Sequence, residues 1–265
     1  MVAIRRPILR GLPALLAISL WAAPGRWCGA EGWIDSREAG PFVCRADFAL
    51  DDYEGLFDDL ARLQQDLVRY LGVPPARTPI ELYLLHDQTS YRRFLSRNLP
   101  DVPYRRALYV RKDGRGMVFA YRGRELPVDL RHECTHALLH ATLPVVPLWL
   151  DEGLAEYFEV TPSERAFGSP HLSGVRWGAR LGLTPRLESL EKQGDFQDMG
   201  GSEYRHAWAW VHFMLHGSEE GRDELVRFLA DIQAHTPPGL LSRRLKRRLP
   251  DLDRRFARHF RGWKP

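Results

Sequence analysis

Cysteine is scarce in this sequence of 265 residues, which contains three, and one of these, Cys28, lies within segment 1–30. The two that remain, Cys44 and Cys134, are too few for a disulfide framework, so a packed core must stabilise the chain. We expect both to be buried free thiols. A single Cys44–Cys134 bond is the alternative, because disulfides persist in exported proteins.

Long hydrophobic runs are also missing, and the apolar run at 11–23 is too short to cross a bilayer. The run follows Arg5, Arg6 and Arg10, and small residues at 28–30 precede Glu31. This arrangement is typical of an export signal cleaved before Glu31, which predicts a periplasmic or extracellular protein. An uncleaved membrane anchor is the alternative, and the paired arginines faintly resemble a twin-arginine signal. Residues 31–265 are then expected to form one domain.

Residues 31–265 carry no net charge, because 34 basic residues there balance 34 acidic ones. The tail is nevertheless basic, because 241–265 has ten Lys or Arg against two Asp, a net charge of +8. Leucine and aromatic residues recur there at helical spacing, which predicts one or two helices packed on the domain with arginines facing water. Contact of these helices with an anionic envelope surface is the alternative. Aromatic residues do not alternate with the basic ones as in single-strand nucleic-acid binding, so we expect no nucleic acid.

The N-terminal half alternates between strand and helix patterns. Period-two alternation predicts a strand at 41–48, and a continuous apolar run predicts a buried strand at 80–85. The apolar runs 107–110 and 117–121 are expected to be strands joined by a hairpin turn at Asp113-Gly114. Helical patterns fall at 51–72 and 88–98, and another follows at 202–216, after a loop-rich stretch (161–200) without periodicity. Strands followed only by helices indicate an α+β fold. We expect a small mixed sheet lobe over about 31–143 and a helical lobe over about 144–265.

Side chains that can bind a metal or transfer a proton are concentrated in the stretch His132-Glu133-Cys134-Thr135-His136, which matches the motif H-E-x-x-H. On a helix the two histidines are one turn apart on one face, so both imidazoles can reach one metal ion. Glu133 lies beside them and is placed to polarise a water molecule. A catalytic zinc site has three protein ligands and an open position, so a third ligand must exist.

Glu152 is the best candidate for that ligand. Pro144 and Pro147 should end the first helix, and a second helix should begin near Leu148 with Glu152 in its first turn. Glu156 follows one turn later on the same face. We expect it to accept the other ring N–H of a ligating histidine, the supporting contact that such sites usually have.

These motifs resemble those of the gluzincin metallopeptidases, and most closely the peptidase MA-like group of exported bacterial proteins. The second motif of that group, W-L-x-E-G-x-A-x-Y, matches residues 149–157. The resemblance is strong over 129–159 and weaker over about 41–230, and the spacing between the motifs is shorter than in thermolysin. It implies a zincin-like fold with Zn²⁺ on His132, His136 and Glu152, and with Glu133 as general base.

The resemblance also implies roles outside the motifs. Tyr204 takes the place of a tyrosine or histidine that supports the oxyanion, although a packed tyrosine at a helix start is an equal alternative. One of the strands 107–110 and 117–121 corresponds to the edge that binds substrate backbone, with plain core strands as the alternative. His171 is expected at the surface, and His206, His212 and His216 are given no metal role.

The sequence therefore predicts an exported zinc metallohydrolase, and specifically a peptidase acting on a peptide or protein substrate. Two alternatives remain: an exported zinc-binding scaffold without turnover, and a zinc hydrolase of a non-peptide amide. The substrate, the choice between endo- and exo-cleavage, and the oligomeric state do not follow from the sequence.

Overall fold

The structure is a computed structural model that describes residues 32–194 and 199–264. The predicted signal at 1–30 lies outside the described residues. Within them, an N-terminal part with all the strands is followed by a part built only of helices, so the α+β expectation is confirmed. None of the helices in this described part combines the length and the apolar character needed to cross a membrane.

The sheet is mixed and has five strands in the order β1-β2-β3-β5-β4. The inner pairs β2–β3 and β3–β5 are parallel, whereas the outer pairs β1–β2 and β4–β5 are antiparallel. The strand that the sequence did not predict is β1, whose exposed positions alternate with only half-buried ones. The strands are β1 (Asp35–Ala39), β2 (Phe42–Ala46), β3 (Ile80–Leu85), β4 (Leu108–Lys112) and β5 (Arg115–Tyr121).

The hairpin between β4 and β5 forms as expected. Asp113 and Gly114 both have positive φ, 51° and 78°, as a two-residue turn of the hairpin-favouring type requires. Of the two hairpin strands, only β4 lies at an edge of the sheet, because β5 pairs with β3 on its other side. The expectation that 117–121 is a candidate substrate edge is therefore wrong, and the strand at 108–112 is the one that remains.

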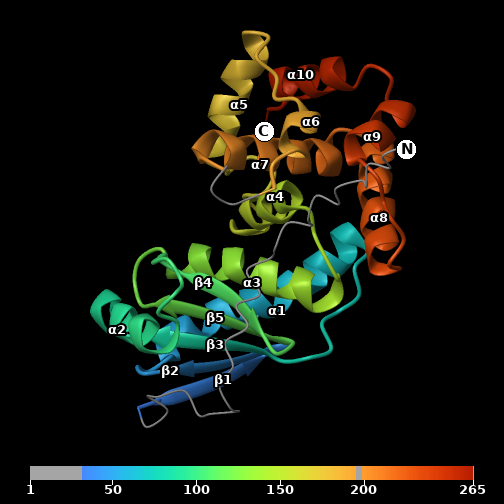
Figure 1. The fold of residues 1–265 in the computed structure, drawn as a ribbon. Helices are drawn as coiled ribbons and strands as arrows, with labels where there is room; N and C mark the ends of the chain where they lie inside the picture. The colour runs from blue at the N-terminus through green and yellow to red at the C-terminus, as the bar shows by residue number, and fades with distance from the viewer. Residues whose placement is uncertain (1–31, 195–198, 265) are drawn as a thin grey trace, which may run out of the picture.

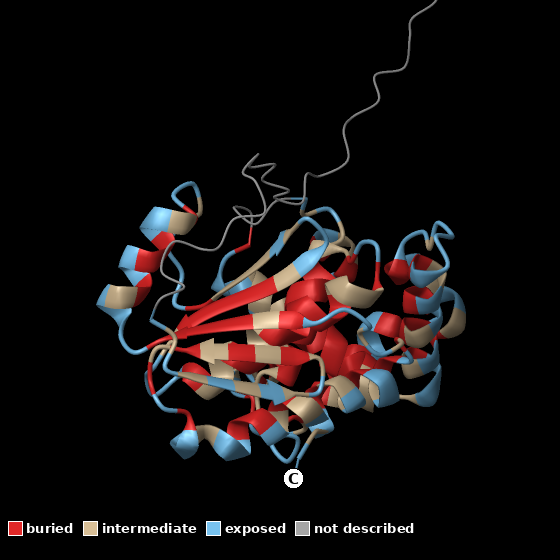
Figure 2. Ribbon diagram, turned by 90° about the horizontal axis from the view of Figure 1, so that it is seen from below, coloured by how far each residue is buried: buried red, intermediate tan, exposed pale blue. Residues whose placement is uncertain are grey.

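Helices cover both faces of the sheet (Figure 1). Helices α1 (Glu54–Leu71) and α3 (Leu126–Thr142) share a core with the side chains of Leu82 and Leu84, and α2 (Gln88–Asn98) packs with Tyr83 and Leu85 on the other face. Alternate residues of β3 thus point to opposite cores. Buried residues run through the inner strands and the helices behind them (Figure 2), so α3 rests on a rigid support.

A sharp break separates α3 from α4 (Leu148–Phe158). Leu143 ends α3 in an extended conformation, and Pro147 precedes α4 with an extended ψ of 133°. Gly153 lets α4 approach α7 (Gly201–His216) closely, because a Cβ there would meet the backbone oxygen of Ala207 at 2.7 Å. The glycine of the second motif therefore serves helix packing and fixes the distance between α4 and α7.

The remaining helices form the end of the molecule opposite the sheet (Figure 1). The stretch at 161–200, expected to be loop-rich and without periodicity, contains the short helices α5 and α6. The helix α8 was not predicted, whereas one or two terminal helices were expected and two, α9 and α10, are found. The elements are α5 (His171–Arg180), α6 (Leu187–Leu190), α8 (Glu219–Gln233), α9 (Leu241–Arg248) and α10 (Leu252–Gly262).

Cys44 and Cys134 are both buried and both free, as the sequence analysis favoured. They belong to the same hydrophobic core. Burial raises the pKa of the Cys44 thiol to about 12 and also raises that of Cys134. Both side chains therefore act as small apolar groups in the core rather than as reactive thiols.

A cluster of neutral histidines joins α7 to α10. His212 Nε2 lies 3.1 Å from the carbonyl oxygen of Ala166, so this nitrogen must donate, and His212 Nδ1 is left to accept from His259 Nε2 at 3.1 Å. The Trp263 indole also donates to Ala166, at 2.7 Å. Burial, followed by nearby histidines, lowers the pKa of His212 to about 3 and that of His259 to about 4.

We expect this cluster to make the protein acid-labile. In the unfolded chain both histidines become protonated below about pH 6.5. In the folded protein, His212 becomes protonated only near pH 3 and His259 only near pH 4. The free energy of unfolding should therefore fall with decreasing pH in that window, by up to about 1.4 kcal/mol per pH unit for each histidine. Urea unfolding of His212→Gln between pH 7 and about pH 4 should show a flatter dependence. The exposed His235→Asn is the control, and an unchanged slope in His212→Gln contradicts the assignment.

Candidate metal centre

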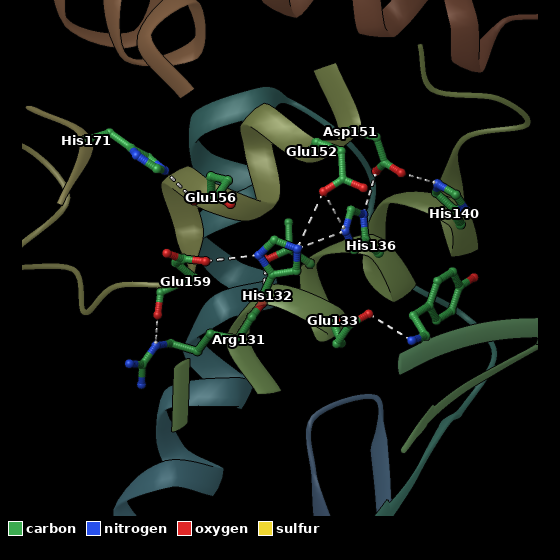
Figure 3. Close-up of polar contacts among 12 residues, drawn as sticks. Arg131, His132, Glu133, His136, His140, Asp151, Glu152, Glu156, Glu159 and His171 are labelled. Atoms are coloured by element: carbon green, nitrogen blue, oxygen red, sulfur yellow. Dashed lines mark hydrogen bonds and ion pairs between the residues drawn. The ribbon is translucent and has the colours of Figure 1, made fainter. Parts of the chain in front are cut away.

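The two motif helices bring His132, His136 and Glu152 together (Figure 3). The ring nitrogens Nε2 of His132 and His136 are 3.3 Å apart. Glu152 Oε2 lies 3.6 Å from the first and 3.7 Å from the second. His136 and Glu152 are buried and His132 is partly buried. The three donor atoms thus converge from α3 and α4 on one enclosed point.

The donor set fits a zinc ion. Zn–N and Zn–O bonds of about 2.0–2.2 Å in a tetrahedron place neighbouring donors roughly 3.3–3.6 Å apart, close to the three spacings here. Two Nε2 atoms that face each other can both act as acceptors only if they share a cation. In the absence of a cation, one of the two nitrogens must carry a proton. Two imidazoles and a carboxylate are a donor set that zinc accepts in proteins.

The outer nitrogens of both rings have carboxylate partners, and neither is Glu156. His132 Nδ1 lies 3.0 Å from Glu159 Oε2. His136 Nδ1 lies 3.1 Å from Asp151 Oδ1, although the angle falls short of an ideal hydrogen bond. The contact expected for Glu156 is therefore corrected, because its carboxylate lies 2.7 Å from His171 Nε2. Donor atoms of Glu156, Glu159 and His132 form a second close group, at the rim of the first.

Asp151 connects the site to a third histidine on the same helix face. Its second oxygen lies 2.9 Å from His140 Nε2, and the His140 ring packs edge-on against Tyr109 of β4. Burial raises the pKa of Asp151, but His136 and His140 outweigh that effect and the net shift is downward. Asp151 is thus an ionised carboxylate that holds His136 in one orientation. Neither Asp151 nor His140 was predicted from the sequence to support the site, although His140 follows His136 by one turn.

The carboxylates make the centre attractive to positive charge. Burial disfavours protonation of His136, yet Asp151 and Glu152 raise its pKa to about 9. Burial likewise opposes protonation of His132, and hydrogen bonds to Glu152 and Glu159 raise its pKa well above the usual value. Protons collect on the rings because negative charge surrounds them, and a divalent cation would displace these protons.

Glu133 lies outside the group of three donors, on the side of the sheet edge (Figure 3). Its Oε2 accepts a hydrogen bond of 2.8 Å from the backbone N–H of Tyr109. That N–H faces away from β5, so it belongs to the open edge of β4. The edge strand therefore fixes the orientation of Glu133, and this contact could not be read from the sequence.

Tyr204 approaches the site from the first turn of α7. Burial and the charge of Glu152 raise the pKa of its hydroxyl, whereas a hydrogen bond with Arg105 and the charge of His132 lower it, and the net shift is upward. Tyr204 thus lies within electrostatic reach of the metal donors and stays protonated at neutral pH. Arg105 comes from the segment before β4, and the sequence analysis did not single it out.

The supporting carboxylates give a measurable prediction. Asp151→Asn and Glu159→Gln should each weaken zinc binding by about 10–100-fold, because each loses the charge that orients a histidine ring. Competition with a chelator, monitored by free zinc, measures this effect without reference to activity. Glu156→Gln is the matched comparison on the same helix and should change the affinity less, since its carboxylate contacts His171. A larger loss in Glu156→Gln than in Glu159→Gln would reverse the assignment.

Comparison with known proteins assigns no family. The chain matches no family model and no curated protein. Among solved structures, it is similar to "Crystal structure of M1 zinc metallopeptidase from Deinococcus radiodurans", with a TM-score of 0.49 and 16% sequence identity. The similarity covers 88% of this chain and 52% of that one, so this chain spans about half the length of that protein.

Proposed function

We propose that this protein is a zincin-like zinc metallohydrolase, and specifically a peptidase. The observation that carries the proposal is the convergence of His132 Nε2, His136 Nε2 and Glu152 Oε2 at mutual spacings of 3.3, 3.6 and 3.7 Å. These atoms would hold the ion, and Asp151 and Glu159 would orient the two rings. When bound, zinc supplies a Lewis acid and lowers the pKa of a water molecule toward 7.

Glu133 is the general base in this proposal. It takes a proton from the attacking water and passes it to the leaving amine. The backbone N–H of Tyr109 holds one carboxylate oxygen at 2.8 Å and leaves the other for the proton. Tyr204, kept protonated and hydrogen-bonded to Arg105, donates to the oxygen that becomes negatively charged.

An extended peptide fits the open edge of β4. Tyr109 and Arg111 alternate with Val110 along this strand, and the Tyr109 N–H faces away from β5. A substrate backbone can pair with the outward carbonyl oxygen of Tyr109 and with the outward groups of Arg111 by adding a strand to the sheet, because Glu133 already accepts from the Tyr109 N–H. Backbone pairing beside the base favours peptide bonds over other amides, which is why we place the peptidase ahead of a non-peptide hydrolase.

Tyr109→Pro tests the contact between the edge and the base. Proline removes the N–H that Glu133 accepts, and an edge strand tolerates it because this N–H makes no bond to β5. We expect kcat to fall, since the base loses the donor that fixes its orientation. Tyr109→Ala keeps the N–H and removes the same ring, so it is the control. Equal kcat values for both variants would exclude the role.

The experiment that tests the proposal itself combines metal analysis with digestion of a peptide library. A peptidase should contain one zinc per chain, cleave within the library, and stop cleaving when zinc is removed. A protein that holds zinc without cleaving any peptide would be the scaffold or the non-peptide hydrolase named above. Export through segment 1–30 belongs to the same proposal, and the N-terminus of the protein secreted by its host would test it.

A further inference from the structure

An exposed apolar tip lies at the end of the molecule opposite the sheet. Trp177, Leu181 and Leu183 are 63%, 68% and 69% exposed. Trp177 lies on the outer face of α5, and Leu181 follows one turn later as the residue that caps the helix. The inner face of α5 is buried through Leu172 and Val175. We call Trp177, Leu181 and Leu183 the α5 tip. Three large apolar side chains so close together in the chain and this exposed are typical of an interaction site.

The backbone holds the α5 tip in a fixed shape. Leu183 N–H donates to Gly178 O at 2.8 Å, and Gly182 N–H approaches Ala179 O at 3.4 Å. Gly182 has a φ of +76°, so this turn is a Schellman helix end. Such a turn commonly buries the side chain at the position of Leu183 against its own helix. Here that side chain points into solvent instead, so the turn presents it outward.

Positive charge surrounds the α5 tip. Segment 166–187 contains Arg176, Arg180 and Arg186 and no acidic residue. The Arg180 guanidinium lies over the Trp177 ring, 5.6 Å from its centroid. The neighbouring helix α10 packs against α5 (Figure 1). Its own exposed arginines 254, 258 and 261 line one shallow depression, so the charge of this end of the molecule is basic on α10 as well.

We propose that the α5 tip docks the protein on an anionic lipid surface. Tryptophan and leucine enter the boundary between headgroups and acyl chains, and the arginines contact lipid phosphates. A partner protein is less favoured, because three exposed apolar side chains beside arginines, with no acidic residue in segment 166–187, match the apolar and anionic layers of a membrane surface. Each arginine near an anionic membrane adds roughly fivefold to the affinity at moderate salt. The proposal is independent of the metal centre.

Sedimentation with vesicles tests the proposal, using the full chain. The protein should pellet with vesicles of equal parts phosphatidylcholine and phosphatidylglycerol, and less with phosphatidylcholine alone. Trp177→Ser/Leu181→Ser/Leu183→Ser should lower the affinity for the mixed vesicles by at least about tenfold. Arg176→Glu/Arg180→Glu should lower it by a similar factor and reduce the salt dependence.

Matched controls lie at the other end of the molecule. Ile34, 71% exposed beside β1, gives the control Ile34→Ser, and exposed arginines of α2 give Arg93→Glu/Arg97→Glu. Both should bind as wild type, and thermal unfolding checks that every variant is folded. Equal binding by the triple serine variant and Ile34→Ser overturns the proposal. So does the absence of binding by wild type, or a triple variant that changes only self-association in sedimentation velocity, which would make the tip a contact between copies.

Discussion

Glu133→Gln is expected to retain zinc, while its hydrolysis rate falls by a factor of at least roughly 10²–10⁴. Glutamine keeps the length of the side chain, and its carbonyl oxygen can still accept from Tyr109 N–H, which holds Glu133 at 2.8 Å. What it lacks is the ability to take a proton from the attacking water. The three metal donors do not include Glu133, so metal content should stay near wild type.

Two measurements on one preparation separate the outcomes. Zinc per chain reports the site, and the rate on a peptide that wild type cleaves reports the chemistry. Full activity in Glu133→Gln would refute the mechanism while leaving the metal site intact. Lost zinc together with lost activity would mean that Glu133 supports the ligands, and the base would then have to be sought elsewhere.

Much of the site could be predicted from the sequence because its geometry is local. Residues four apart on a helix share a face, so His132 and His136 had to point the same way. The prolines at 144 and 147 fixed the break, and this placed Glu152 at the start of the next helix. The hairpin followed from Asp113-Gly114 for the same reason, since only a turn with positive φ joins those strands.

Contacts between elements could not be predicted in the same way. The positions of Glu156 and Glu159 on α4 differ by less than one turn, and which of them reaches His132 depends on the angle at which α4 crosses α3. Helical periodicity leaves that angle open. The Glu133 contact with Tyr109 depends on the register of the sheet edge against α3, which again no local pattern records.

The helices missed in the sequence have a different cause. Helix α5 is short and contains Gly174 and Gly178, and Gly182 follows its end. Trp177 within the helix and Leu181 directly after it are exposed. Its apolar residues therefore do not form a single stripe, and helical periodicity is blurred. If lipid covers the outer face, as proposed above, α5 has two apolar faces: one packs on the protein core and the other contacts lipid.

Removal of any one metal donor is expected to abolish zinc binding at micromolar free zinc. His132→Ala, His136→Ala and Glu152→Ala each leave two donors from a set of three, and the two that remain cannot enclose the ion. Glu152→Gln is the sharper variant, because it keeps size and packing in a residue that is 2% exposed and removes only the charge. Zinc per chain after dialysis and thermal unfolding with and without zinc measure the effect.

The same variants should also lose the stabilisation that zinc gives. Wild type should unfold at a higher temperature with zinc than without it, because zinc binds only the folded site. The donor variants should show no such difference. In their zinc-free forms, His136→Ala should be the least stable, since it leaves the ionised Asp151 buried with His140 as its remaining partner. Undiminished zinc in Glu152→Gln would remove Glu152 from the donor set and make Glu159 of the second close group the next candidate.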